Sequence, residues 1–133
     1  TIIPLSLSLG LVWQYLDTWR IVFLVFAILG FLLITITRLI PASGKFPILA
    51  LAVTHGIAGM TIFLLPILLA FQGRVNPGFA WVGVGGALIG VGGLLLSFLK
   101  TGKAILSKEQ ILRVLPGLLL LMTLCFVAGF AMA

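Results

Sequence analysis

Charged side chains are scarce in this chain. Among 133 residues, Asp and Glu together occur twice and Lys and Arg eight times, so charged residues make up only 8%. Hydrophobic residues make up 62%. A water-soluble globule of this length needs far more polar residues to cover its surface. The composition therefore excludes an ordinary soluble domain and predicts an integral membrane protein covered by lipid.

Reactive and metal-ligating side chains are equally few, because the sequence has one Cys and one His. Metal-assisted hydrolysis needs several His, Cys or carboxylate ligands, and nucleophilic catalysis needs a nucleophile, a base and an orienting group. The two carboxylates, Asp17 and Glu109, are expected at opposite sides of the membrane and so cannot form an acid–base pair. We therefore predict that the protein is not an enzyme.

What the sequence does contain is four long apolar runs, at about residues 20–40, 46–71, 77–99 and 111–133. Each is comparable to the roughly 20 residues that an α-helix needs to cross ~30 Å of hydrocarbon. The pattern predicts an all-α bundle of four transmembrane helices, forming a single transmembrane domain over residues 1–133. No run has an acidic or basic residue near its middle, where ion-coupled transporters typically place a carboxylate. The sequence therefore argues against a coupled transporter.

The eight basic residues lie at or near the ends of these runs and predict which side each loop faces. Loop 38–45 carries two and loop 100–113 carries four, whereas the opposite side carries only Arg20 and Arg74. Cytoplasmic loops are enriched in Lys and Arg, so we expect loops 38–45 and 100–113 to lie in the cytoplasm or stroma. The protein is then expected in a bacterial inner membrane, a thylakoid membrane or an organelle equivalent. Amphipathic rings, which settle among headgroups, fall on the opposite side: Trp13, Tyr15, Trp19 and Trp81. Because topology explains the net charge of +6, no nucleic-acid partner is expected.

A further apolar segment, residues 2–16, precedes the first run. As a helix it would cover only ~22 Å, less than a full span. The side chains of Asp17 and Thr18 are expected to cap the helix that begins near Trp19, which marks a break between two helices. Two interpretations stay open for the segment: an interfacial or re-entrant helix on the outer side, which we favour, or a partial fifth span.

Glycines crowd the third run, with seven between positions 78 and 93. Gly86, Gly90 and Gly93 share one helical face, and Gly85 and Gly92 lie on an adjacent stripe. Helices without intervening side chains can approach backbone to backbone, where dispersion and weak Cα–H···O contacts stabilise the pair. We predict that Gly86, Gly90 and Gly93 form a helix-packing face, within this protein or against a partner. The alternative is a path along which a flat ligand or lipid tail lies.

Two other patterns concern the shape and the start of helices. Pro66 and Pro116 fall inside the second and fourth runs, where a missing backbone N–H and a steric clash predict kinks.

Ser107 and Gln110 have the spacing of a capping box, in which each side chain accepts a hydrogen bond from the other's backbone N–H. The fourth helix is therefore expected to begin in water.

The histidine, His55, gives the one chemical clue. It lies ~13 Å along the second predicted span, past the interface but short of the bilayer centre, where an ionisable residue needs a polar partner or a ligand. Gly56 and Gly59 leave room beside it for a planar ring, and a neutral imidazole can supply one axial bond to haem iron or chlorophyll magnesium. His55, Gly56 and Gly59 are thus the candidate cofactor site, with His55 as metal ligand. The simpler interpretation, which we favour, is a hydrogen bond from His55 to a neighbouring helix.

By elimination, the sequence predicts a non-catalytic accessory or structural subunit of a larger membrane bioenergetic complex, photosynthetic or respiratory. The expected partners are other membrane subunits and bilayer lipids, and the expected cofactor is chlorophyll or haem. The alternative is a small channel or carrier for an uncharged or lipid-like solute, with Pro66 and Pro116 as hinges and the glycine-rich helix lining the path.

Overall fold

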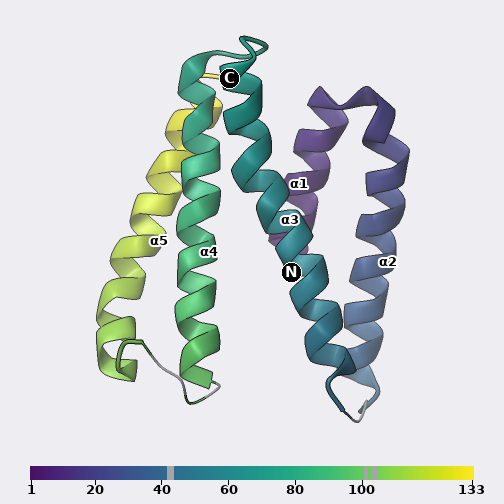
Figure 1. Ribbon diagram of the computed structural model, residues 1–133, viewed down its shortest axis with the longest axis vertical. Helices are drawn as coiled ribbons and strands as arrows, with labels where there is room; N and C mark the ends of the chain where they lie inside the picture. The colour runs from purple at the N-terminus through teal and green to yellow at the C-terminus, as the bar shows by residue number, and fades with distance from the viewer. Residues whose placement is uncertain (42–43, 101, 103–104) are drawn as a thin grey trace. The chain divides into compact units, whose positions relative to one another are not determined.

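The computed structural model describes residues 1–41, 44–100, 102 and 105–133, and every regular element in these residues is helical. In chain order they are α1 (Ile2–Tyr15), η1 (Asp17–Trp19), α2 (Arg20–Leu39), α3 (Phe46–Phe71), η2 (Pro77–Phe79), α4 (Ala80–Lys100) and α5 (Lys108–Ala131), where η denotes a 3₁₀ helix (Figure 1).

Four helical segments in the described residues are long and apolar enough to cross a bilayer: Asp17–Leu39, Phe46–Phe71, Pro77–Leu96 and Lys108–Ala131. They match the four apolar runs of the sequence, so the all-α fold and its four helices of spanning length are confirmed. The predicted basic loops 38–45 and 100–113 lie partly outside the described residues.

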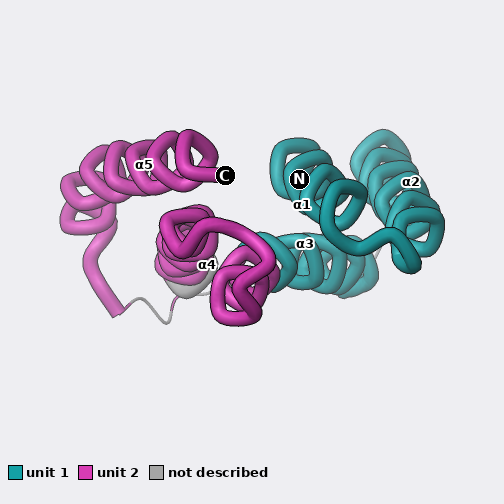
Figure 2. Tube along the Cα trace, turned by 90° about the horizontal axis from the view of Figure 1, so that it is seen from above, with its two compact units in different colours: residues 1–62 teal, residues 63–133 magenta. Residues whose placement is uncertain are grey.

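The chain divides into two compact units, residues 1–62 and residues 63–133 (Figure 2). The boundary falls within α3, which therefore contributes its first part to the first unit and its last part to the second. Each unit has its own buried side chains, and each is described below by itself.

In the first unit, α1 and α2 lie side by side and antiparallel (Figure 1). Leu5 of α1, Ala27 of α2 and Ala58 of α3 form a buried cluster, against which Leu9 and Phe26 pack. Small side chains at two of these positions let the three helices approach closely, as is usual where helices pack without a hydrophobic driving force.

The turn between α1 and α2 differs from the sequence prediction. The chain leaves the α-helical conformation at Leu16 (φ −126°, ψ 75°), which confirms the break. The predicted capping is wrong, because neither η1 nor α2 has a side-chain cap, and Asp17 forms an ion pair with Arg20 instead. The physical reason is the 3₁₀ turn, which brings the Asp17 carboxylate beside the guanidinium three residues later.

The antiparallel packing of α1 along α2 also bears on the open interpretation of residues 2–16. A helix that lies in the membrane plane would run across a spanning helix rather than beside it. A re-entrant helix could also lie along α2, so both interpretations of residues 2–16 stay predictions.

In the second unit, α4 and α5 pack antiparallel (Figure 1). Phe79 at the start of this pair is fully buried and contacts Phe130 edge to face, with ring centroids 5.9 Å apart. At the other end of α5, the predicted capping box is confirmed: the Gln110 N–H donates to Ser107 Oγ at 3.2 Å, and the Ser107 N–H donates to Gln110 Oε1 at 3.0 Å.

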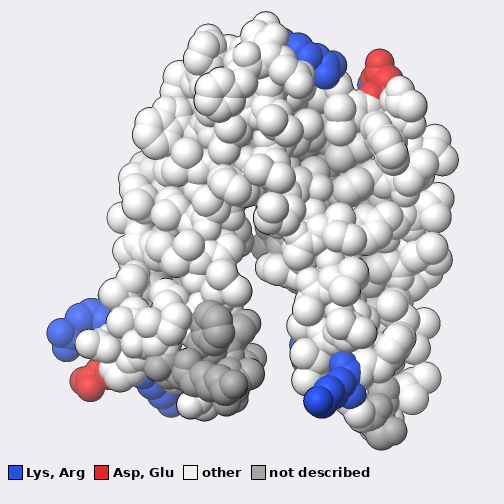
Figure 3. All heavy atoms as spheres, in the orientation of Figure 1, with Lys and Arg blue, Asp and Glu red and all other residues white. Residues whose placement is uncertain are grey.

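The sides of the long helices are apolar and poorly covered. Only 11% of the apolar window in α2 and in α5 is buried, and 22% and 33% of those in α3 and α4. On the face shown in Figure 3, charged side chains lie near helix ends, and the surface between them is uncharged. Contiguous apolar surface on this scale marks a membrane or protein contact rather than a face in water.

Candidate functional site

His55 lies on α3 beside the face that this helix buries. That face is a row with a spacing of four residues, Ala50, Thr54, Ala58 and Ile62, each less than 9% exposed. Residues four apart lie one above the other on a helix, whereas consecutive residues are about 100° apart. His55 therefore sits at the edge of the packed row and is half-buried.

No described residue forms a hydrogen bond with the imidazole, whose nitrogen atoms are not fully buried in the structure. The backbone next to it is bare, because no atom lies within 4 Å of the position that a Cβ would take at Gly56 or at Gly59. The backbone beside His55 is thus open at these two positions, and room for a planar ring there stays a prediction. The role of the three residues in binding a cofactor stays a prediction.

A metal centre built only from protein ligands is not found in the described residues, where no three His, Cys, Asp or Glu side chains come together. Cys125 is buried in α5 and belongs to the second unit. The chemistry open to His55 is thus a hydrogen bond or a single axial bond to a metal that other ligands hold, as in a tetrapyrrole.

The glycines of α4 point to several neighbours. A Cβ at Gly85 would lie 2.8 Å from the ring of Phe126, and one at Gly92 would lie 2.8 Å from Leu118 Cδ2, so both glycines pack against α5. A Cβ at Gly83 would lie 2.5 Å from the carbonyl oxygen of Phe63 in α3. These three are glycines that bring α4 close to its neighbours within the second unit.

The predicted packing face, Gly86, Gly90 and Gly93, behaves differently along its length. Gly86 is buried, but Gly90 and Gly93 are exposed and have no atom within 4 Å of a Cβ position. The adjacent stripe, Gly85 and Gly92, makes the contact with α5 instead. Packing of Gly90 and Gly93 against a partner outside the chain stays a prediction.

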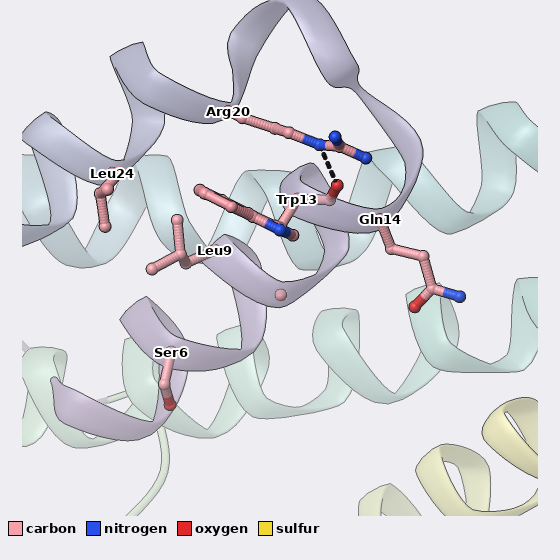
Figure 4. Close-up of a pocket in the computed structure, with 7 residues that line it drawn as sticks. Ser6, Leu9, Trp13, Gln14, Arg20 and Leu24 are labelled. Carbon is pink, nitrogen blue, oxygen red and sulfur yellow. Dashed lines mark hydrogen bonds between the residues drawn. The ribbon is translucent and has the colours of Figure 1, made fainter.

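A groove at the α1–α2 end of the first unit was not anticipated from the sequence. It is shallow and widely open, has a volume of about 710 Å³, and is lined by Ser6, Leu9, Gly10, Trp13, Gln14, Arg20 and Leu24. In Figure 4 the side chains from α1 follow one another along the helix below Arg20, which extends from α2 over Trp13. In the sequence, Trp13 lies near the end of an apolar run and Asp17 lies three residues before Arg20. Many helix ends have such residues, so the pattern does not predict a groove.

Arg20 is held firmly at the mouth of this groove. Its Nε donates to the carbonyl oxygen of Trp13, its guanidinium carbon lies 5.7 Å from the centroid of the Trp13 ring, and one terminal nitrogen pairs with Asp17. A guanidinium has five N–H donors, of which these two bonds use two, so about three remain for another group.

Comparison with protein-family models, with curated proteins and with solved structures gives no match for this chain.

Proposed function

We propose that the protein is a non-catalytic accessory subunit of a larger integral membrane complex. One supporting feature is the apolar surface of α2, which is exposed in the structure and which lipid and neighbouring helices would cover together. The open glycine positions on α3 and α4 supply places where a helix from another subunit could approach closely.

The observation that carries this proposal is His55. An imidazole at membrane depth without a hydrogen-bond partner is costly, because no water replaces the missing bond. No described residue supplies one, and the backbone beside the ring is open at Gly56 and Gly59. A polar group or a bound ligand from a neighbouring subunit would satisfy the ring.

We further propose that the complex is bioenergetic, photosynthetic or respiratory, with chlorophyll or haem as the group that His55 contacts. One axial imidazole beside backbone that carries no side chain at Gly56 and Gly59 suits a tetrapyrrole ring. The proposed setting is a bacterial inner or thylakoid membrane, or an organelle equivalent, with loops 38–45 and 100–113 on the cytoplasmic or stromal side.

Native purification in mild detergent tests the proposal. We expect the full chain to co-purify with larger membrane subunits, and His55→Leu to reduce their recovery by about fivefold or more, because a hydrogen bond or axial bond in a dry site is lost. Visible absorbance in the wild-type preparation that His55→Leu removes would identify a tetrapyrrole.

A second test replaces a glycine beside His55 by leucine, and the same replacement elsewhere controls for the effect of leucine on α-helix stability. Gly59→Leu fills the space beside His55 and should reduce co-purification, whereas Gly117→Leu makes the same change at an open position of α5 and should not. A chain that purifies alone, without subunits or visible absorbance, would refute the proposed function.

The second candidate is a small channel or carrier for an uncharged or lipid-like solute. It is supported by Pro66 and Pro116, which lie inside the long helices α3 and α5 and remove one backbone hydrogen bond from each. Flux into liposomes that contain only this protein would favour the carrier, and vesicles that stay sealed would dismiss it.

A further inference from the structure

We propose that the α1–α2 groove binds a zwitterionic phospholipid of the phosphatidylethanolamine type. The headgroup would lie at the mouth of the groove, and the upper part of one acyl chain would lie along its apolar wall. The site is separate from His55 and does not depend on the proposed function.

The mouth of the groove is complementary to a headgroup that carries both charges. The free N–H donors of Arg20 suit a phosphate, which guanidinium groups bind through several charge-assisted hydrogen bonds. Asp17 uses one carboxylate oxygen for Arg20, and its side chain is 80% exposed, so the other oxygen can accept from an ammonium group. Arg20 would therefore face the negative phosphate, and Asp17 would face the positive ammonium group of the same headgroup.

The groove is polar at Arg20 and Gln14 and mostly apolar away from them, and the Ser6 hydroxyl at its far end already donates to the carbonyl oxygen of Ile3. Ser6 and Trp13 lie seven residues apart on α1, which is about 10 Å of helix. Between them, Leu9 lies on one side of the groove and Leu24 of α2 on the other (Figure 4), and Gly10 also lines it. An open groove with two leucines and a glycine suits a flexible acyl chain rather than a rigid helix, which needs anchors over several turns.

The position of the groove along α2 also fits a headgroup. Arg20 is the first residue of α2, and Trp13 and Trp19 lie at the same end of this spanning helix. Indole rings settle at the headgroup level of a bilayer. This holds for either orientation of the chain, so the site does not rest on which side faces the cytoplasm.

The charge of Asp17 selects against anionic lipids. A phosphatidylglycerol headgroup has a phosphate for Arg20 but no cation for the second carboxylate oxygen of Asp17. We therefore expect the groove to retain phosphatidylethanolamine in preference to phosphatidylglycerol with the same acyl chains.

Native mass spectrometry of the full chain in detergent, with both lipids at equal concentration, tests this inference. We expect one phosphatidylethanolamine to remain bound at collision energies that strip the other lipids. Arg20→Gln should lower this occupancy about tenfold, because charged hydrogen bonds to the phosphate are lost. Asp17→Asn should shift the preference about threefold toward phosphatidylglycerol, a modest change because the carboxylate is exposed.

Matched variants separate lipid binding from folding. Arg38→Gln removes a guanidinium from the opposite end of α2 and should leave the retained lipid unchanged. Gly10→Leu fills the groove where a Cβ meets no other atom, and should displace the lipid while the helix content stays constant. Gly117→Leu, at an equally open position of α5, should not displace it.

Two results would overturn the inference. Equal retention of both lipids in the wild type, unchanged by Gly10→Leu, would identify non-specific annular lipid. Loss of a dimer in Gly10→Leu, without loss of lipid, would identify a second copy of the chain as the occupant. If Arg20→Gln does not fold, Gly10→Leu decides between these results.

Discussion

At Gly30, α2 leaves no room for a side chain. A Cβ there would lie 2.7 Å from Cγ2 and 3.3 Å from Oγ1 of Thr54, a buried residue of α3. We expect Gly30→Ala to lower the free energy of unfolding by about 1–2 kcal/mol, because the added methyl must push α2 and α3 apart. Reversible unfolding in detergent micelles measures this change.

The clash at Gly30 can be relieved from the other side. Thr54→Ser removes the Cγ2 methyl, so the double variant Gly30→Ala/Thr54→Ser should be more stable than the sum of the two single changes predicts. Gly56→Ala is the control, since its Cβ meets no atom and alanine favours helix by up to about 1 kcal/mol. Equal effects of Gly30→Ala and Gly56→Ala would contradict the close approach of α2 and α3.

The start of α5 depends on the reciprocal bonds of Ser107 and Gln110. We expect Ser107→Ala to destabilise the protein by about 1 kcal/mol, because the Gln110 N–H loses its acceptor. Faster amide hydrogen exchange in the first turn of α5 would accompany the loss. Thr35→Ala, which removes a hydroxyl bonded to Phe31 O within α2, should leave that exchange unchanged.

Among the elements, α4 offers a comparison on one helix. Gly83→Ala should destabilise the second unit by about 2 kcal/mol or more, because its Cβ would meet the backbone oxygen of Phe63, which cannot rotate away. Gly90→Ala should be neutral or stabilising by up to about 1 kcal/mol, since nothing lies near it. Thermal unfolding of the two variants side by side measures the difference.

The larger substitution Gly90→Leu separates an internal role of this glycine from an external one. If Gly90 and Gly93 pack against another subunit, the variant should fold normally, but less of the complex should be recovered with it in native purification. Unfolding of the isolated chain by Gly90→Leu would instead mean that the stripe packs within the protein.

Much of the element pattern could be predicted because it depends on local sequence. The four helices of spanning length follow from uninterrupted apolar runs, and the capping box at Ser107 and Gln110 follows from side chains three residues apart. Both features need no knowledge of which helices are neighbours.

The remaining features depend on tertiary packing. The contact of Gly85 and Gly92 with α5 depends on where α5 lies, and the packing face predicted at Gly86, Gly90 and Gly93 stays a prediction. Asp17 could accept from the backbone or from Arg20, and the 3₁₀ turn brought it to Arg20. The groove required α1 to lie along α2, which the sequence had left open. The position of His55 within a long apolar helix could be predicted, but its lack of a hydrogen-bond partner in the first unit could not.

For the whole molecule, the distribution of basic residues predicts a topology that single-cysteine labelling can test. In a Cys125→Ser background, Lys45→Cys and Lys108→Cys should react with an impermeant maleimide only from the cytoplasmic side, and Thr18→Cys and Gln72→Cys only from the other side. Reaction of positions 45 and 72 from the same side would mean that α3 does not cross the bilayer.

The ion pair between Asp17 and Arg20 has a consequence for biogenesis. In the proposed topology, the turn that joins α1 to α2 must be translocated while the chain is being inserted, and carrying a lone Arg through hydrocarbon costs several kcal/mol. Pairing leaves the turn without net charge. The first two helices can therefore enter the membrane together as a preformed hairpin, ahead of the more basic segments that remain behind.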